Sequence, residues 1–244
     1  MKFIPRYKII FAGLLIAIGL AALQPASVHA DDNLPLSNYW KSKISRWADL
    51  ILSNADDRGL DPNLICSIIF EESKGDPNIV SPAGAVGLLQ VMPFPWRPSA
   101  ESLKDPAVNL IAGTKTLSEI IRQAQGRLHI ALMAYNSSWP RLNVPLARSF
   151  ARKVLEQYAR SILFDAGYDL KQVEGWTMII VSHSSAGPMQ ADRFRSDGTF
   201  EPIVDFDPSI APDNTPHAVA YATIDPNFIA WWIDVWVYPT LNSN

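Results

Sequence analysis

The sequence predicts a mainly α-helical protein whose C-terminal part is an extension of β or irregular structure. Apolar residues recur every three to four positions in most of the chain before residue 167, which is the spacing of amphipathic helices. After residue 168 the apolar runs become β-prone and are separated by clusters of Gly, Pro, Asp and Asn. With 244 residues, 48% of them hydrophobic, the chain has enough apolar material for a sizeable core.

The first thirty residues have the composition of a secretory signal peptide. Lys2, Arg6 and Lys8 precede an apolar run, and Val28-His29-Ala30 ends the segment with a small residue at a cleavage position. The run has about 15 residues, whereas a helix that spans a bilayer needs about 20. We therefore expect residues 1–30 to be cleaved rather than kept as an anchor, and the protein to be exported to the periplasm, the cell wall or the medium.

Composition disfavours several classes of partner and site. Cleavage after Ala30 takes the formal net charge from −3 to −6, so no basic surface is predicted and nucleic acid is not an expected partner. The single Cys66 has no disulfide partner in the chain and is expected to be a small buried hydrophobe. His129, His183 and His217 lack the spacing of metal ligands, so no metal site is predicted.

Helix boundaries are marked by capping residues. Asp61-Pro62 and Asp105-Pro106 each place an N-cap residue before a proline, so a helix is expected to begin at each pair. The predicted helices cover residues 38–60, 62–73, 105–126, 127–136 and 146–166. Residues 74–102 contain many Gly and Pro and are expected to form an ordered functional loop. The β-prone runs are residues 176–182, 217–224 and 228–238.

One predicted helix carries a carboxyl group along its apolar stripe. Glu72 falls near the middle of the face formed by Leu64, Ile65, Ile68 and Ile69. Glu71 points about 100° away, toward the edge of the stripe. Burial would keep the Glu72 carboxyl protonated to a higher pH, which suits a general acid near neutrality. The helix pattern alone also fits a solvated, idle Glu72 at a frayed helix end.

Three ordered motifs resemble those of one family. Residues 72–93 contain Glu-Ser, Asp-Pro, Ser-Pro-Ala-Gly-Ala-Val-Gly-Leu-Leu-Gln and Met-Pro, and they strongly resemble the signature of soluble-type lytic transglycosylases. Leu89 stands where that family usually has methionine, a swap of similar volume. Asn109-x-x-x-Gly113 and Ala-Leu-x-x-Tyr135-Asn136 match two further motifs. The resemblance covers roughly residues 40–160 and implies a lysozyme-like, goose-type helical domain, which we place at residues 38–167, followed by an extension of unknown role over residues 168–244.

The chain departs from this pattern in two places. After Asn136 the family usually has Ala-Gly-Pro-Gly, whereas this chain has Ser-Ser-Trp-Pro over residues 137–140, so the glycines that permit close backbone approach are missing. After Pro93 the usual Thr-Ala is replaced by Phe94-Pro95-Trp96. The walls of the substrate cleft are expected to differ here. Trp96 and Trp139 are either sugar-stacking residues or packing residues.

The resemblance implies a reaction and a set of site residues. The substrate would be the peptidoglycan glycan strand, cut at the β-1,4 bond between N-acetylmuramic acid and N-acetylglucosamine. Glu72 would act first as acid and then as base, which leaves a 1,6-anhydro end without water and without a metal or organic cofactor. Tyr135 would hydrogen-bond Glu72, and Gln90 and Asn136 would contact the glycan. Ser73 belongs to the same substrate-binding set and is expected to support the loop after the helix.

Other functions fit the same residues. A lysozyme-type hydrolase would take a second carboxylate from Glu71, Asp76 or Glu101. A non-catalytic cell-wall module would bind the glycan without cutting it. A role within cell-envelope machinery, such as a conjugation, secretion or phage apparatus, would use the same chemistry. In the C-terminal part, Trp231, Trp232 and Trp236 either form a glycan platform or close a core.

Overall fold

The computed structural model of the protein describes residues 35–184, 187–207, 215–224 and 230–242. The segment predicted as a signal peptide, residues 1–30, lies outside the described residues. None of the helices in the described part of the chain combines the length and the apolar character that a membrane span requires.

The helices follow the predicted order. They are α1 (Ser42–Ser45), α2 (Ala48–Arg58), α3 (Pro62–Ser73), α4 (Pro106–Gln123), α5 (Leu128–Ser137) and α6 (Pro145–Asp165), with short 3-10 turns η1 (Ser102–Lys104) and η2 (Trp139–Arg141). The Asp61 carboxylate accepts a hydrogen bond from the Asn63 N–H, and Asp105 caps α4 in the same way. The two capped starts are therefore confirmed.

The predicted helix over residues 38–60 is wrong in its length. It is two helices, α1 and α2, separated at Arg46 and Trp47. Both side chains donate hydrogen bonds to the backbone carbonyl of Gly75, which lies after α3. A contact with a distant part of the chain thus accompanies the break, and such a contact leaves no local signal in the sequence.

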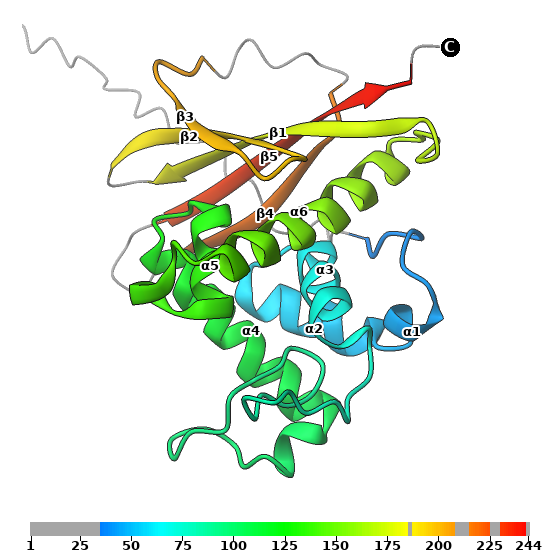
Figure 1. Ribbon diagram of the computed structural model, residues 1–244, viewed down its shortest axis with the longest axis vertical. Helices are drawn as coiled ribbons and strands as arrows, with labels where there is room; N and C mark the ends of the chain where they lie inside the picture. Colours follow the sequence, from blue (N-terminus) through cyan, green and yellow to red (C-terminus); the bar gives the residue numbers. More distant parts are fainter. Residues whose placement is uncertain (1–34, 185–186, 208–214, 225–229, 243–244) are drawn as a thin grey trace, which may run out of the picture.

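The C-terminal part is a five-stranded antiparallel sheet. Its strands are β1 (Val173–Ser184), β2 (Gly187–Arg195), β3 (Phe200–Ile203), β4 (His217–Ile224) and β5 (Ala230–Leu241), in the order β3-β2-β1-β5-β4. Figure 1 shows the sheet lying along one side of the helices, with α6 running beneath it. β1 and β5 are the longest strands and form the middle of the sheet.

The prediction of a mainly α-helical fold with a C-terminal extension is wrong. The sheet is an integral part of an α+β structure, because alternate residues of its central strands lie in the same hydrophobic core as the helices. These residues include Trp176, Met178, Ile180, Ile233, Val235 and Val237. β2 and β3 were not predicted, since β2 has no continuous apolar run and β3 has only four residues, one of them a proline.

One partly buried ion pair joins the helices to the sheet. Arg127, at the N-cap of α5, donates two hydrogen bonds of 2.9 Å to the Asp192 carboxylate on β2. Asp192 is only 3% exposed. His129 is fully buried beside the rings of Phe194 and Phe200. The helices and the sheet are therefore held by a polar contact as well as by their shared core.

Candidate active site

Glu72 lies in the last turn of α3, directly after the buried apolar stripe. Leu64, Ile65, Ile68 and Ile69 are each 0% exposed, and the Glu72 side chain is half-buried beyond them. No described residue forms a hydrogen bond or an ion pair with its carboxyl group. Burial, and next the charge of Glu71, raise the pKa of Glu72 from 4.5 to about 7. The carboxyl group therefore holds its proton near neutrality, as a general acid must.

Ser73 closes the helix and anchors the chain that follows. It is 1% exposed, and its hydroxyl lies 3.1 Å from the Ile69 carbonyl and 2.9 Å from the Leu88 carbonyl. The hydroxyl also accepts a hydrogen bond of 3.1 Å from the Gly75 N–H. A side chain so deeply buried has no surface for a glycan. Ser73 supports the loop, and its bonds fix the end of the helix on which Glu72 lies.

The motifs around Asn109 and Tyr135 converge on the backbone of residues 86–90, here called the brace segment. Asn109 accepts a hydrogen bond of 2.8 Å from the Leu89 N–H and donates to the carbonyls of Val86 and Leu103. Tyr135 donates to the Leu89 carbonyl at 2.8 Å. At Gly113, an added Cβ would lie 2.5 Å from the Leu89 side chain. The motifs therefore fix this segment in place.

The Tyr135 hydroxyl donates its hydrogen bond to the brace segment, at the Leu89 carbonyl. The expected partner was Glu72. Burial, and next the charge of Glu72, raise the pKa of Tyr135, so the two groups interact through their charges. The Tyr135 ring is stacked with Phe150 at 6.4 Å. Tyr135 is thus a rigid neighbour that positions Leu89 beside the catalytic candidate.

Gln90 and Asn136 each use only part of their side-chain hydrogen-bonding capacity within the described residues. The Gln90 backbone has a φ of 46°, and its side-chain amide donates to the carbonyls of Ile79 and Gly87. Asn136 accepts a hydrogen bond from Ser137. Among the described residues, the Gln90 carbonyl oxygen and the Asn136 amide nitrogen have no partner, and both side chains are partly exposed.

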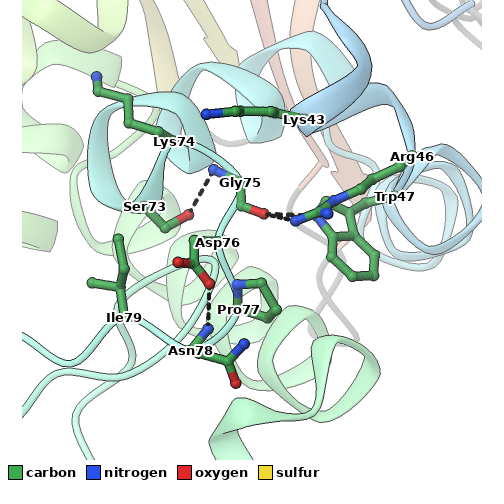
Figure 2. Close-up of a pocket in the computed structure, with 10 residues that line it drawn as sticks. All are labelled: Lys43, Arg46, Trp47, Ser73, Lys74, Gly75, Asp76, Pro77, Asn78 and Ile79. Atoms are coloured by element: carbon green, nitrogen blue, oxygen red, sulfur yellow. Dashed lines mark hydrogen bonds between the residues drawn. The ribbon is translucent and has the colours of Figure 1, made fainter.

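A pocket of about 570 Å³ lies next to this site, at the turn after α3 (Figure 2). Arg46 and Trp47 donate to the Gly75 carbonyl at 2.7 and 3.1 Å, and Asp76 accepts from the Asn78 N–H. Gly75 has a φ of +82°, and an added Cβ would lie 2.1 Å from the Lys43 carbonyl. Glu72 does not line this pocket. The polar side chains that line the pocket hold the turn that follows Ser73. The sequence did not indicate this role.

The other carboxylates near the motif all have partners. Glu71 pairs with Lys74 at 3.4 Å, Glu101 pairs with Lys104 at 2.8 Å, and Asp76 caps its own turn. Glu72 differs from these three in having none. Within the described residues, no three His, Cys, Asp or Glu side chains are grouped as a metal site would require.

The chain is similar to lytic transglycosylases. It is 33% identical over 90 residues to the membrane-bound lytic murein transglycosylase E of Buchnera aphidicola. The aligned residues cover 32% of this chain and 41% of the relative. It is 43% identical over 72 residues to the endo-type membrane-bound lytic murein transglycosylase A of Klebsiella pneumoniae. The aligned residues cover 25% of this chain and 36% of the relative. A crystal structure of the 70 kDa soluble lytic transglycosylase of Escherichia coli has a TM-score of 0.45 at 22% identity, over 49% of this chain and 24% of that chain.

The chain spans less than half the length of each of these relatives. Residues 49–158 match the family model described as the transglycosylase SLT domain. That range contains Glu72, the brace segment, Asn109 and Tyr135. Residues 49–158 of this chain are therefore similar to the transglycosylase SLT domain.

Proposed function

We propose that the protein is a peptidoglycan lytic transglycosylase that cuts the β-1,4 bond between N-acetylmuramic acid and N-acetylglucosamine and leaves 1,6-anhydro ends. The observation that carries the proposal is Glu72, a half-buried carboxyl group without a hydrogen-bond partner, whose pKa of about 7 lets it give and take a proton near neutrality. The similarity to lytic murein transglycosylases supports the same substrate class.

Glu72 performs both steps of the reaction. Its protonated carboxyl gives its proton to the bridging oxygen as the bond from that oxygen to C1 of N-acetylmuramic acid breaks. The resulting carboxylate then takes the proton of the C6 hydroxyl, and O6 forms a bond to C1. The proton that was given is thus recovered, no water is consumed, and Glu72 ends in its starting state.

The neighbouring residues have separate roles in this proposal. Ser73 and Tyr135 position the end of α3 and the Leu89 backbone, respectively. Gln90 and Asn136 contact the polar groups of the glycan through their unpartnered atoms. Burial, and next the negative charge of Glu71, keep Glu72 protonated. Glu71, Asp76 and Glu101 have contacts of their own, and the proposed reaction needs no second carboxylate.

The proposal includes the place where the protein acts. Residues 1–30 direct export, and the protein works in the cell envelope on the glycan strand. Residues 38–167 form the catalytic part. The sheet that follows supports it from the other side of the shared core.

The test is digestion of purified peptidoglycan with residues 31–244 and with the Glu72→Gln variant, followed by mass spectrometry of the released fragments. We expect fragments about 18 Da, or one water, lighter than the products of hydrolysis, and none from the variant. Ordinary reducing ends would instead indicate a lysozyme-type hydrolase. Binding to the wall without any release would indicate a non-catalytic module.

A further inference from the structure

An exposed aromatic pair lies on the turn that replaces the family's usual Thr-Ala. The rings of Phe94 and Trp96 are stacked, with centroids 5.2 Å apart and planes 20° from parallel. Trp96 is 79% exposed and Phe94 is 40% exposed. The Arg97 guanidinium lies 5.4 Å from the centre of the Phe94 ring. A tryptophan this exposed, supported by a second ring, presents a broad flat apolar surface to a ligand.

The turn is rigid before any ligand binds. Pro93, Pro95 and Pro98 restrict the backbone on both sides of the rings. The Phe94 carbonyl accepts a hydrogen bond of 2.8 Å from the Arg97 N–H, and the Phe94 N–H donates to the Met92 carbonyl at 3.1 Å. Holding the Trp96 ring in place in advance reduces the entropy that binding would cost.

The turn is joined to the candidate active site. Val86 and Val91 exchange two backbone hydrogen bonds of 3.0 Å, so the brace segment leads directly into the turn. Burial and the charge of Glu72 raise the pKa of Tyr135, and the positive charge of Arg97 opposes them. Arg97 therefore acts on the same hydroxyl that Glu72 acts on. The aromatic pair follows the brace segment along the same loop, and Arg97, which lies over the Phe94 ring, brings its charge near Tyr135.

The other exposed tryptophan of this region is not equivalent. Trp139, which is 37% exposed, donates from its indole nitrogen to Gln123 at 2.7 Å. Its ring is fixed by this bond, and no described aromatic side chain is stacked against it. Trp139 therefore presents less free ring surface than Trp96 and provides a control for it.

From these observations, we propose that Trp96, backed by Phe94, is a stacking platform for a sugar ring of the glycan strand just outside the Glu72 site. A β-1,4-linked pyranose ring carries axial C–H groups on both faces and therefore packs flat on an indole ring. The platform gives the enzyme a preference for strands that reach beyond the bond being cut. This inference rests on the proposed function.

The binding test uses the Glu72→Gln protein, which cannot cut, and the β-1,4-linked hexamer of N-acetylglucosamine in calorimetric titrations. Trp96→Ala is expected to weaken binding about 3- to 10-fold, the value of one aromatic stacking contact. Trp96→Tyr, which keeps a flat ring, should restore most of the affinity. Trp139→Ala should leave it unchanged. If the Glu72→Gln protein binds the hexamer equally well with and without Trp96→Ala, the platform proposal is wrong.

Kinetics separate this inference from the proposed function. In the protein with Glu72, Trp96→Ala should raise KM on long glycan strands without a matching loss in kcat, because stacking holds the ground state and the transition state alike. Fragment release with unchanged KM would refute the platform and leave the function standing. If hexamer binding depends on Trp96 but the native protein releases no fragments, the platform stands and the proposed function is wrong. Loss of binding to anionic lipid vesicles, with hexamer affinity unchanged, would assign Trp96 to a membrane contact and reject the platform.

Discussion

Glu71 and Glu72 are adjacent carboxylates with different surroundings. Glu71 has a cation partner, since Lys74 lies 3.4 Å away and also packs over the Phe70 ring. Glu72 has no such partner and is raised to a pKa of about 7 by burial and by Glu71. In the proposed reaction the two neighbouring carboxyl groups have separate roles: the charge of Glu71 raises the pKa of Glu72 further, and Glu72 is the acid that reacts.

The pH dependence of the reaction is the first prediction. Because Glu72 must be protonated to act as acid, kcat/KM should fall about tenfold per pH unit once the pH rises above the pKa of Glu72. Glu71→Gln removes a charge that raises this pKa, so the fall should begin at a lower pH. Initial rates on soluble glycan strands measure it. Glu101→Gln, at an exposed ion pair, is the control. If the pH at which kcat/KM begins to fall shifts equally in both variants, Glu71 does not act on Glu72 as proposed.

The stability of Glu72→Gln is the second prediction. The folded state raises the pKa of Glu72 above its ordinary value of 4.5, so Glu72 contributes stability below pH 4.5 that is lost as the pH rises through about 7. Gln carries no charge and avoids this loss. The variant should therefore be more stable than the native protein by about 1–3 kcal/mol near pH 8, with little difference near pH 4. Urea unfolding at both values measures this, and a pH-independent difference would show that burial of the charge is not the cause.

At the scale of elements, the brace segment joins three helices. Its backbone is bonded to Ser73 of α3, Asn109 of α4 and Tyr135 of α5. None of the three is a general acid or base in the proposed reaction. They hold an irregular loop at fixed positions on the helices, which is how a loop attains the precision that a catalytic site needs.

The loss of Asn109 is the third prediction. Asn109→Ala leaves the Leu89 N–H and the Leu103 carbonyl without partners in a buried place and removes one of the two donors to the Val86 carbonyl. It should therefore lower the free energy of unfolding by about 2–4 kcal/mol. It should also lower kcat/KM under conditions where the protein stays folded, because the brace segment moves. Chemical denaturation and steady-state rates measure the two effects. Asn143→Ala, at an exposed position, should change neither; a similar loss there would show that the effect is not specific to the brace.

Much of the site could be predicted because its signals are local. The capped start of α3 and the apolar stripe predicted that Glu72 lies near the end of a helix with a buried face, as the structure shows. The bonds by which Asn109 holds the loop were not predicted. The Tyr135 bond to Leu89 and the Gly75 bonds to Arg46 and Trp47 join residues far apart in the sequence, and no local pattern encodes such pairs. The part that sequence reasoning missed is therefore the support of the site.

At the scale of the whole molecule, the same reason explains the wrong fold class. β1, β4 and β5 have apolar runs that marked them as β-prone, whereas β2 has a buried Asp192 whose partner Arg127 is 65 residues away. A buried carboxylate reads as a solvent-exposed residue until its partner is known. The sheet was thus underestimated by two strands, and with it the extent of the core that it shares with the helices.

That ion pair gives the last prediction, because it joins the helices to the sheet. Arg127→Ala leaves the buried Asp192 charge without a partner and should cost about 3–5 kcal/mol of unfolding free energy. The double variant Arg127→Leu, Asp192→Leu removes both charges and should recover most of that loss. Arg193→Ala breaks an exposed pair with Glu201 and should cost no more than about 1 kcal/mol. Thermal unfolding followed by circular dichroism compares the three. If the helices and the sheet are one cooperative unit, each variant melts in one transition at a shifted temperature. If Arg127→Ala instead loses the circular dichroism signal of the sheet before that of the helices, the shared core alone does not hold the two parts together.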